Sequence, residues 1–159
     1  MGIYFHPSLF NAEAFECSTH SDIYECIAEG WVEEDPYGWH IDGYDIISVG
    51  AWVDSSGREY TGSIVDFLVA KLPIESSNNM QAYKAVKLLR KLTWKFGNLY
   101  EKTEGMFYGY LSGQEVKELH SLLQQCFTTS EWTASGKVAM IKILAIATEH
   151  NSGLLYRCS

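Results

Sequence analysis

The chain has 159 residues, of which 47% are hydrophobic and 14% aromatic, and its formal net charge at pH 7 is −8. This composition is typical of one globular domain with a packed core, and it excludes a chain that is disordered throughout. The longest nearly apolar run, residues 138–147, is shorter than the roughly 20 residues that span a bilayer. We therefore expect a single domain over residues 1–159 and no membrane association.

The first third of the chain predicts three short elements. Residues 2–6 have the composition of a β-strand, which Pro7 should end. Residues 8–18 predict a short helix with Asn11 as its N-terminal cap. Residues 21–30 predict a second helix, which begins at a serine and ends at a glycine.

The middle of the chain predicts a hairpin and two helices. Residues 46–60 alternate around a turn, as the two strands of a hairpin do. Residues 63–72 predict a helix that ends before Pro73. Residues 78–96 have apolar side chains at helical spacing and predict the longest helix of the protein.

The last third of the chain predicts two more helices between two strands. Residues 106–111 are strand-like, and Ser112 with Glu115 forms the capping box of the helix that follows. Residues 135–150 are apolar nearly all round and predict the innermost helix. Residues 153–158 predict a last strand that pairs with the first.

These elements together predict an α+β fold. The expected sheet is small and mainly antiparallel, and it combines the first strand, the hairpin, residues 106–111 and the last strand. Four or five helices pack on it in one compact domain.

Charge is distributed unevenly along the chain. Residues 1–57 contain eleven of the twenty carboxylates and no lysine or arginine, so every basic side chain follows from Arg58 onward. An acidic region of this kind repels the phosphates of nucleic acid and attracts a basic protein or a basic surface. We therefore expect a basic protein partner and regard nucleic-acid binding as disfavoured.

Four lysines form a stripe on the helix predicted over residues 78–96: Lys84, Lys87, Lys91 and Lys95. Like charges one helical turn apart cost about 0.2 to 0.5 kcal/mol a pair unless a negative group faces them. A solvated face is the simplest interpretation, and a stripe that faces the acidic half of the chain is the alternative.

Residues 29–45 concentrate aromatic and acidic side chains and contain no lysine or arginine. Trp31, Tyr37 and Trp39 are residue types that protein interfaces favour, because their rings bring large contact area and few rotors. The accompanying candidate partner-binding acids are Glu33, Glu34, Asp35, Asp42 and Asp45. The alternative is that the tryptophans point inward and that the acids only keep a turn-rich segment hydrated.

A zinc site is the weaker interpretation of the N-terminal cysteines and histidines. Cys17, His20, Cys26 and His40 include ligand types that zinc accepts, but their spacing matches no standard zinc module. Cys26 also fits the apolar face of its helix. We therefore expect no metal and no cofactor, with buried cysteine and surface histidines.

Catalytic signatures are absent from the sequence. It contains no G-x-S-x-G elbow, no phosphate-binding loop and no dinucleotide fingerprint. Carboxylates beside aromatic rings are common in glycosidases, so a small hydrolase or metal-dependent enzyme that uses residues 29–45 with His20 or His40 is the alternative function.

The function predicted from the sequence is a non-enzymatic, cytoplasmic, acidic binding protein of the inhibitor or immunity type. The chain's start supports this compartment, because residues 1–10 lack the features of a secretory signal peptide. Its four cysteines are expected to be reduced and mostly buried. A nucleic-acid mimic is a second alternative.

Overall fold

The structure is a computed structural model. It describes residues 5–19, 23–33, 50–53, 59–62, 64–76, 80–93, 96–99 and 107–158, and the structural statements below concern these residues. In this part of the chain, no helix combines the length and the apolar character that crossing a bilayer requires.

A four-stranded antiparallel sheet in the order β2-β1-β6-β5 is at the centre of the protein. Its strands are β1 (Phe5–Phe10), β2 (Val32–Glu33), β5 (Phe107–Leu111) and β6 (Gly153–Cys158). The pairing of the first strand with the last is confirmed, with Phe5 opposite Cys158 and Phe10 opposite Gly153. The predicted α+β fold is therefore confirmed.

The prediction that Pro7 ends the first strand is wrong. Strand β1 continues through Pro7, which lies opposite Tyr156 of β6. Among the described residues, β2 pairs only with Leu9 and Phe10, so at Pro7 the strand has β6 as its neighbour on one side alone. A strand tolerates a residue without an N–H at such an edge position.

The hairpin is confirmed as a pair of strands but not as part of the central sheet. Strands β3 (Gly50–Val53) and β4 (Glu59–Gly62) pair with each other as a separate antiparallel sheet. The rest of the predicted hairpin, residues 46–49 and 54–58, lies outside the described residues.

Two short helices are confirmed, but residues 8–10, predicted as part of the first helix, belong to strand β1. Helix α1 (Ala12–Glu16) begins after Asn11, whose Oδ1 accepts the N–H of Ala14 at 3.1 Å. Helix α2 (Ile23–Ala28) ends close to Gly30, which has the positive φ of 79° that glycine adopts readily after a helix.

Helix α3 (Ile64–Glu75) passes through Pro73, although the sequence predicts an end before it. Pro73 lies in the last turn of the helix, and Ser76 N–H still donates to the carbonyl of Leu72 at 2.8 Å. The carboxylate of Glu75 also accepts the N–H groups of Thr129 and Ser130, which lie beyond the helix. These contacts keep the last turn helical despite the local preference of proline.

The predicted helix over residues 78–96 is shorter than expected and is not the longest. Helix α4 (Met80–Leu89) continues as a 3₁₀ turn, η1 (Arg90–Leu92), and ends where Thr93 becomes extended. The side chain of Thr93 donates to the carbonyl of Arg90 at 2.7 Å and stops the helix. Beyond it, Asn98 N–H donates to the carbonyl of Lys91 at 3.2 Å.

The last two helices are the longest described. Helix α5 (Gly113–Gln125) has the predicted capping box, because Ser112 and Glu115 bond to each other's backbone N–H. Helix α6 (Glu131–Glu149) begins four residues before the predicted 135–150 segment, with Ser130 as its cap. It is also not buried all round, since Val138 and Lys142 are exposed.

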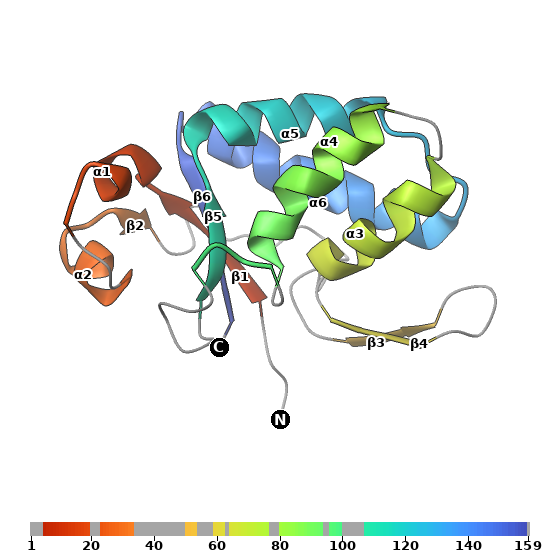
Figure 1. Cartoon of the computed structure of the whole chain (residues 1–159), viewed down its shortest axis with the longest axis horizontal. Coiled ribbons are helices and arrows are strands. Elements are labelled where there is room, and N and C mark those ends of the chain that lie inside the picture. The colour runs from red at the N-terminus through yellow and green to blue at the C-terminus, as the bar shows by residue number, and fades with distance from the viewer. Residues whose placement is uncertain are drawn as a thin grey trace.

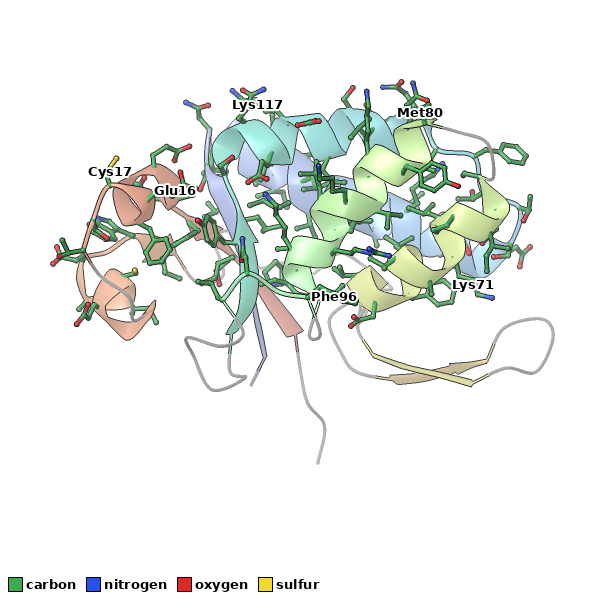
Figure 2. The ribbon with its side chains drawn as sticks, viewed as in Figure 1. Glu16, Cys17, Lys71, Met80, Phe96 and Lys117 are labelled. Atoms are coloured by element: carbon green, nitrogen blue, oxygen red, sulfur yellow. The ribbon has the colours of Figure 1, made fainter. Side chains whose placement is uncertain are left out.

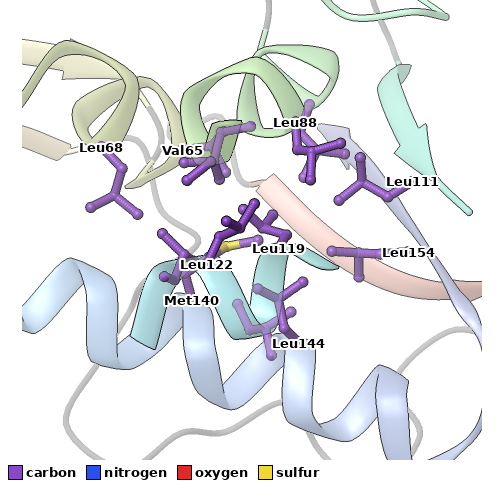
Figure 3. Close-up of a cluster of buried hydrophobic side chains, with 14 of the residues drawn as sticks. Val65, Leu68, Leu88, Leu111, Leu119, Leu122, Met140, Leu144 and Leu154 are labelled. Atoms are coloured by element: carbon purple, nitrogen blue, oxygen red, sulfur yellow. The ribbon is translucent and has the colours of Figure 1, made fainter. Parts of the chain in front are cut away.

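The sheet has a hydrophobic core on each of its two faces. Alternate residues of a strand point to opposite faces, and Leu9 and Leu154 accordingly join one cluster while Phe10 and Leu155 join another. Helices α3 to α6 cover the first face, and α1 and α2 lie on the other (Figure 1). The larger cluster gathers leucines, valine and methionine from α3, α4, α5, α6 and the sheet (Figure 3).

Candidate partner-binding surface

The structure describes only the beginning of the candidate segment 29–45. Trp31 is described with its side chain, and Glu33 is described as part of the backbone of β2. The other candidate residues lie outside the described residues: Glu34, Asp35, Tyr37, Trp39, Asp42 and Asp45. Their assignment stays a prediction.

Trp31 connects α2 to β2 and is half-buried. Its N–H donates to the carbonyl of Cys26 at 3.0 Å, and its own carbonyl accepts the N–H of Asn11 at 2.8 Å. Its ring packs against the smaller core cluster. Trp31 thus has both properties that the sequence left as alternatives, because it contributes to packing and keeps part of its surface accessible.

We call α1, α2 and β2, residues 11–19 and 23–33, the acidic lobe. An aromatic triangle attaches it to the sheet: Phe10 and Phe15 are 5.6 Å apart between ring centroids, and Tyr110 lies 5.3 and 5.4 Å from them. Tilted and edge-to-face pairs at these distances add to the stability of simple burial. The lobe is therefore packed firmly against β1 and β5.

The exposed side of the acidic lobe is negative. Glu13, Glu16, Glu25 and Glu29 are all exposed, and the lobe contains no lysine or arginine. Glu16 accepts a hydrogen bond from the hydroxyl of Tyr110 at 3.1 Å. Four carboxylates are thus presented on a lobe that is fixed to the sheet.

Tyr110 reports the negative potential at the edge of this lobe. Partial burial raises the pKa of its phenol, and the carboxylates of Glu16 and Glu115 raise it further, to about 12. Ionisation would place the negative phenolate beside the negative carboxylate of Glu16. Partly buried surroundings disfavour two such adjacent charges.

One lysine of the predicted stripe already has an acidic partner, and that partner is not in the acidic half. Lys91 forms an ion pair with Glu115 at the start of α5. Burial opposes ionisation of Glu115, but the hydrogen bonds from Lys91 and Ser112 outweigh it and lower its pKa. Lys84 and Lys87 are exposed, and Lys95 lies outside the described residues.

The outward face of α4 also has apolar side chains, which were not predicted from the sequence. We call Met80, Tyr83, Lys84, Lys87 and Arg90 the α4 surface; all five are exposed. Beyond it, the ring of Phe96 lies 5.4 Å from the guanidinium carbon of Arg90. The signal was present in the sequence, since Met80 and Tyr83 follow the spacing of the lysines and not that of the buried alanines and leucines.

The weak zinc candidates do not form a site among the described residues. Cys26 is fully buried in the smaller core cluster, as its helical position predicted. Cys17 is exposed at the C-terminal end of α1 (Figure 2). His20 and His40 lie outside the described residues, and the described part of the chain holds no group of three metal-binding side chains.

Searches for similar proteins give no match: no protein-family model, no curated protein and no solved structure resembles this chain.

Proposed function

We propose that this protein is a non-enzymatic, cytoplasmic binding module of the inhibitor or immunity type, which docks a basic protein on its acidic lobe and on the residues that follow it to Asp45. One observation carries the proposal. Eleven carboxylates precede the first basic side chain, and four of them, Glu13, Glu16, Glu25 and Glu29, are exposed on a firmly packed support.

The physical advantage of such a lobe is in the rate of association. Complementary charge steers two proteins together and raises the association rate by about 10-fold to 1,000-fold at low salt. The aromatic triangle fixes the lobe to the sheet, so its carboxylates need little reordering when a partner arrives. Pre-organised charge of this kind supports recognition of a basic surface.

The half-buried ring of Trp31 supports the same proposal as an anchor. Interface hot spots are enriched in tryptophan and tyrosine, which lie in well-packed, fully desolvated pockets of the complex. Trp31 lies beside the exposed acids of α2, and Tyr37 and Trp39 follow it in the sequence. In the proposed complex these three rings fill pockets of the partner while the acids meet its positive charge.

The test compares two charge-reversed variants as baits with the wild-type protein in lysate of the source cells. Glu25→Lys with Glu29→Lys reverses the exposed acids of α2, whereas Glu118→Lys with Glu149→Lys reverses exposed acids on α5 and α6. We expect wild type and the second variant to retain the same basic protein, and the first variant to lose it. The recovered protein is identified by mass spectrometry.

Salt dependence completes the test. Between about 0.1 M and about 1 M salt the Debye length falls from about 10 Å to about 3 Å, so the association rate of the recovered partner should fall at least about tenfold. A salt-independent rate, an acidic partner other than a second copy of this chain, or equal binding by both variants would contradict the proposal. Elemental analysis tests the enzymatic alternative, because a stoichiometric transition metal is incompatible with a simple binding module.

A further inference from the structure

The α4 surface combines apolar and basic side chains that the proposed function does not use. Met80 and Tyr83 are 66% and 60% exposed, and Ile74 and Phe127 are 68% and 65% exposed. Large apolar side chains with this exposure are unusual in a folded protein when they lie close together, and they mark binding surfaces.

Contacts between helices bring Ile74 and Phe127 to the same corner of the protein as the start of α4. Ser76 donates a hydrogen bond to the carbonyl of Phe127. The carboxylate of Glu75 accepts the N–H groups of Thr129 and Ser130 at 2.6 and 2.7 Å. Met80 follows Ser76 by only four positions in the chain, so the start of α4 lies within roughly 14 Å of this contact. We call the end of α3, the α5–α6 connection and the start of α4 the apolar corner.

The positive charge of the α4 surface favours binding of an acidic partner. Lys84, Lys87 and Arg90 extend from the apolar corner along one side of the helix, and α4 contains no acidic residue. Glu115 already pairs with Lys91, and Glu75 accepts the N–H of Ser130 at the start of α6. Docking a second copy with α4 against α4 would bring these cations against one another, which like-charge repulsion disfavours.

The acidic lobe has the complementary charge, but it lies elsewhere in the same molecule. Glu16 and Cys17 of the lobe are at the opposite end of the view from Met80 (Figure 2). The α4 surface of one copy therefore cannot reach the lobe of that copy, whereas it can reach the lobe of another.

We propose that the α4 surface binds the acidic lobe of a second copy of this chain, so that copies associate head to tail. The apolar corner supplies the contact area, and Lys84, Lys87 and Arg90 meet the exposed carboxylates of the lobe. Such a contact is heterologous, so copies assemble into a ring if the rotation closes and into an open chain if it does not. This self-association requires no basic partner, but it uses the lobe that a basic partner would cover, so it is measured on the purified protein alone.

Sedimentation velocity of the purified protein over a range of concentrations tests the proposal. At about 0.1 M salt we expect the wild-type sedimentation coefficient to rise with concentration, and at about 1 M salt to stay near the monomer value because the charges are screened. Lys84→Glu with Lys87→Glu should weaken association at least about tenfold, since it places like charges in the contact.

A matched control separates the contact from overall charge. Lys117→Glu with Lys142→Glu makes the same change in net charge at exposed positions on α5 and α6. This control should self-associate as the wild type does. Circular dichroism of each variant establishes that it is folded, and glutamate keeps a good helix propensity at both sites on α4.

Mixing two variants tests the head-to-tail geometry directly. The α4 variant retains an intact lobe, and the Glu25→Lys, Glu29→Lys variant retains an intact α4 surface. Each should be monomeric alone, and an equimolar mixture should associate through the intact α4 surface of one variant and the intact lobe of the other.

Three results overturn the proposal. These are a wild type that stays monomeric at all concentrations and salts, an α4 variant that associates like its control, and a mixture that stays monomeric. A fluorescent single-stranded oligonucleotide is added as a further probe. If it binds monomeric wild type and not the α4 variant, the surface belongs to nucleic acid and not to a second copy.

Discussion

The hydroxyl of Tyr110 donates a hydrogen bond to Oε1 of Glu16 at 3.1 Å, across a separation of 94 residues. Tyr110 belongs to β5 and Glu16 to the last turn of α1, so this bond joins the acidic lobe to the sheet. The ring of Tyr110 also packs against Phe10 and Phe15. One side chain therefore contributes both packing and a polar contact to the attachment of the lobe.

Tyr110→Phe should lower the free energy of unfolding by about 0.5 to 1.5 kcal/mol, because it removes the hydrogen bond to Glu16 and keeps the ring contacts. Urea denaturation followed by tryptophan fluorescence measures the change. Tyr83→Phe is the matched control, since the ring of Tyr83 is largely exposed on α4, and it should be neutral. Equal effects of the two substitutions would show that the bond contributes nothing.

Stability should fall between about pH 10 and about pH 12 through Tyr110. Burial and the carboxylates of Glu16 and Glu115 raise the pKa of this phenol to about 12, whereas in the unfolded chain the pKa is near its ordinary value of 10.0. The unfolded state therefore releases this proton first, and the free energy of unfolding decreases as pH rises through that window. Ultraviolet titration of tyrosinate should show a late component that Tyr110→Phe lacks.

Glu75→Gln should destabilise the protein by about 1.5 to 3 kcal/mol, because a charged acceptor is lost beside several donors. Burial opposes ionisation of Glu75, but hydrogen bonds from Thr133, Ser130 and Thr129 outweigh it and lower its pKa. The stabilisation is present above the unfolded pKa near 4.5 and is lost as pH falls through the folded pKa.

The comparison for Glu75 is Glu118→Gln, an exposed glutamate of α5, which should change stability by no more than about 0.5 kcal/mol. Denaturant unfolding at several pH values below neutrality measures both variants. The wild type should lose its advantage over Glu75→Gln as the solution is acidified. A constant difference between the two proteins at every pH would rule out the ionic role.

Gly109→Ala should cost at least about 3 kcal/mol or prevent folding. A Cβ at this position of β5 would lie 1.6 Å from the carbonyl oxygen of Lys91 and 2.7 Å from Oδ1 of Asn98. Gly113→Ala is the matched control, because the nearest atom to its Cβ is a glutamate oxygen at 3.4 Å. In helix α5 that alanine should be neutral or should stabilise by up to about 1 kcal/mol. Soluble yield and urea unfolding distinguish the two.

Cys17 should react with a maleimide well before Cys26 and Cys126. Cys17 is exposed and the other two are buried, and burial raises the pKa of the Cys126 thiol despite the opposing effect of Lys137. Because the thiolate is the reactive form, we expect labelling of the buried pair to be at least about tenfold slower. Peptide mapping by mass spectrometry identifies the modified residue. Equal rates in the native protein would contradict the buried positions.

Local signals predicted the elements well where a few neighbouring residues decide the conformation. The capping box of Ser112 and Glu115 and the cap at Asn11 are bonds between residues three apart, and both are present as predicted. The same reasoning was wrong at Pro7 and Pro73. At those positions the chain keeps a strand and a helix because of neighbours that are distant in the sequence.

The candidate site was predictable only in its chemistry. The accumulation of carboxylates before Arg58 is evident from the sequence, but the attachment of the lobe by Phe10, Phe15 and Tyr110 depends on strands that are remote in the chain. The same holds for the partner of Lys91, which is Glu115 of α5 and not an acid of the first third.

The order of residues by itself determined the α+β class, the caps of two helices and the separation of charge along the chain. Only the tertiary structure decided which side of the sheet each helix covers, where a proline is tolerated and which charges meet. The physical reason is that capping and periodicity are properties of adjacent residues, whereas burial, ion pairing and exposure depend on which distant segments pack together.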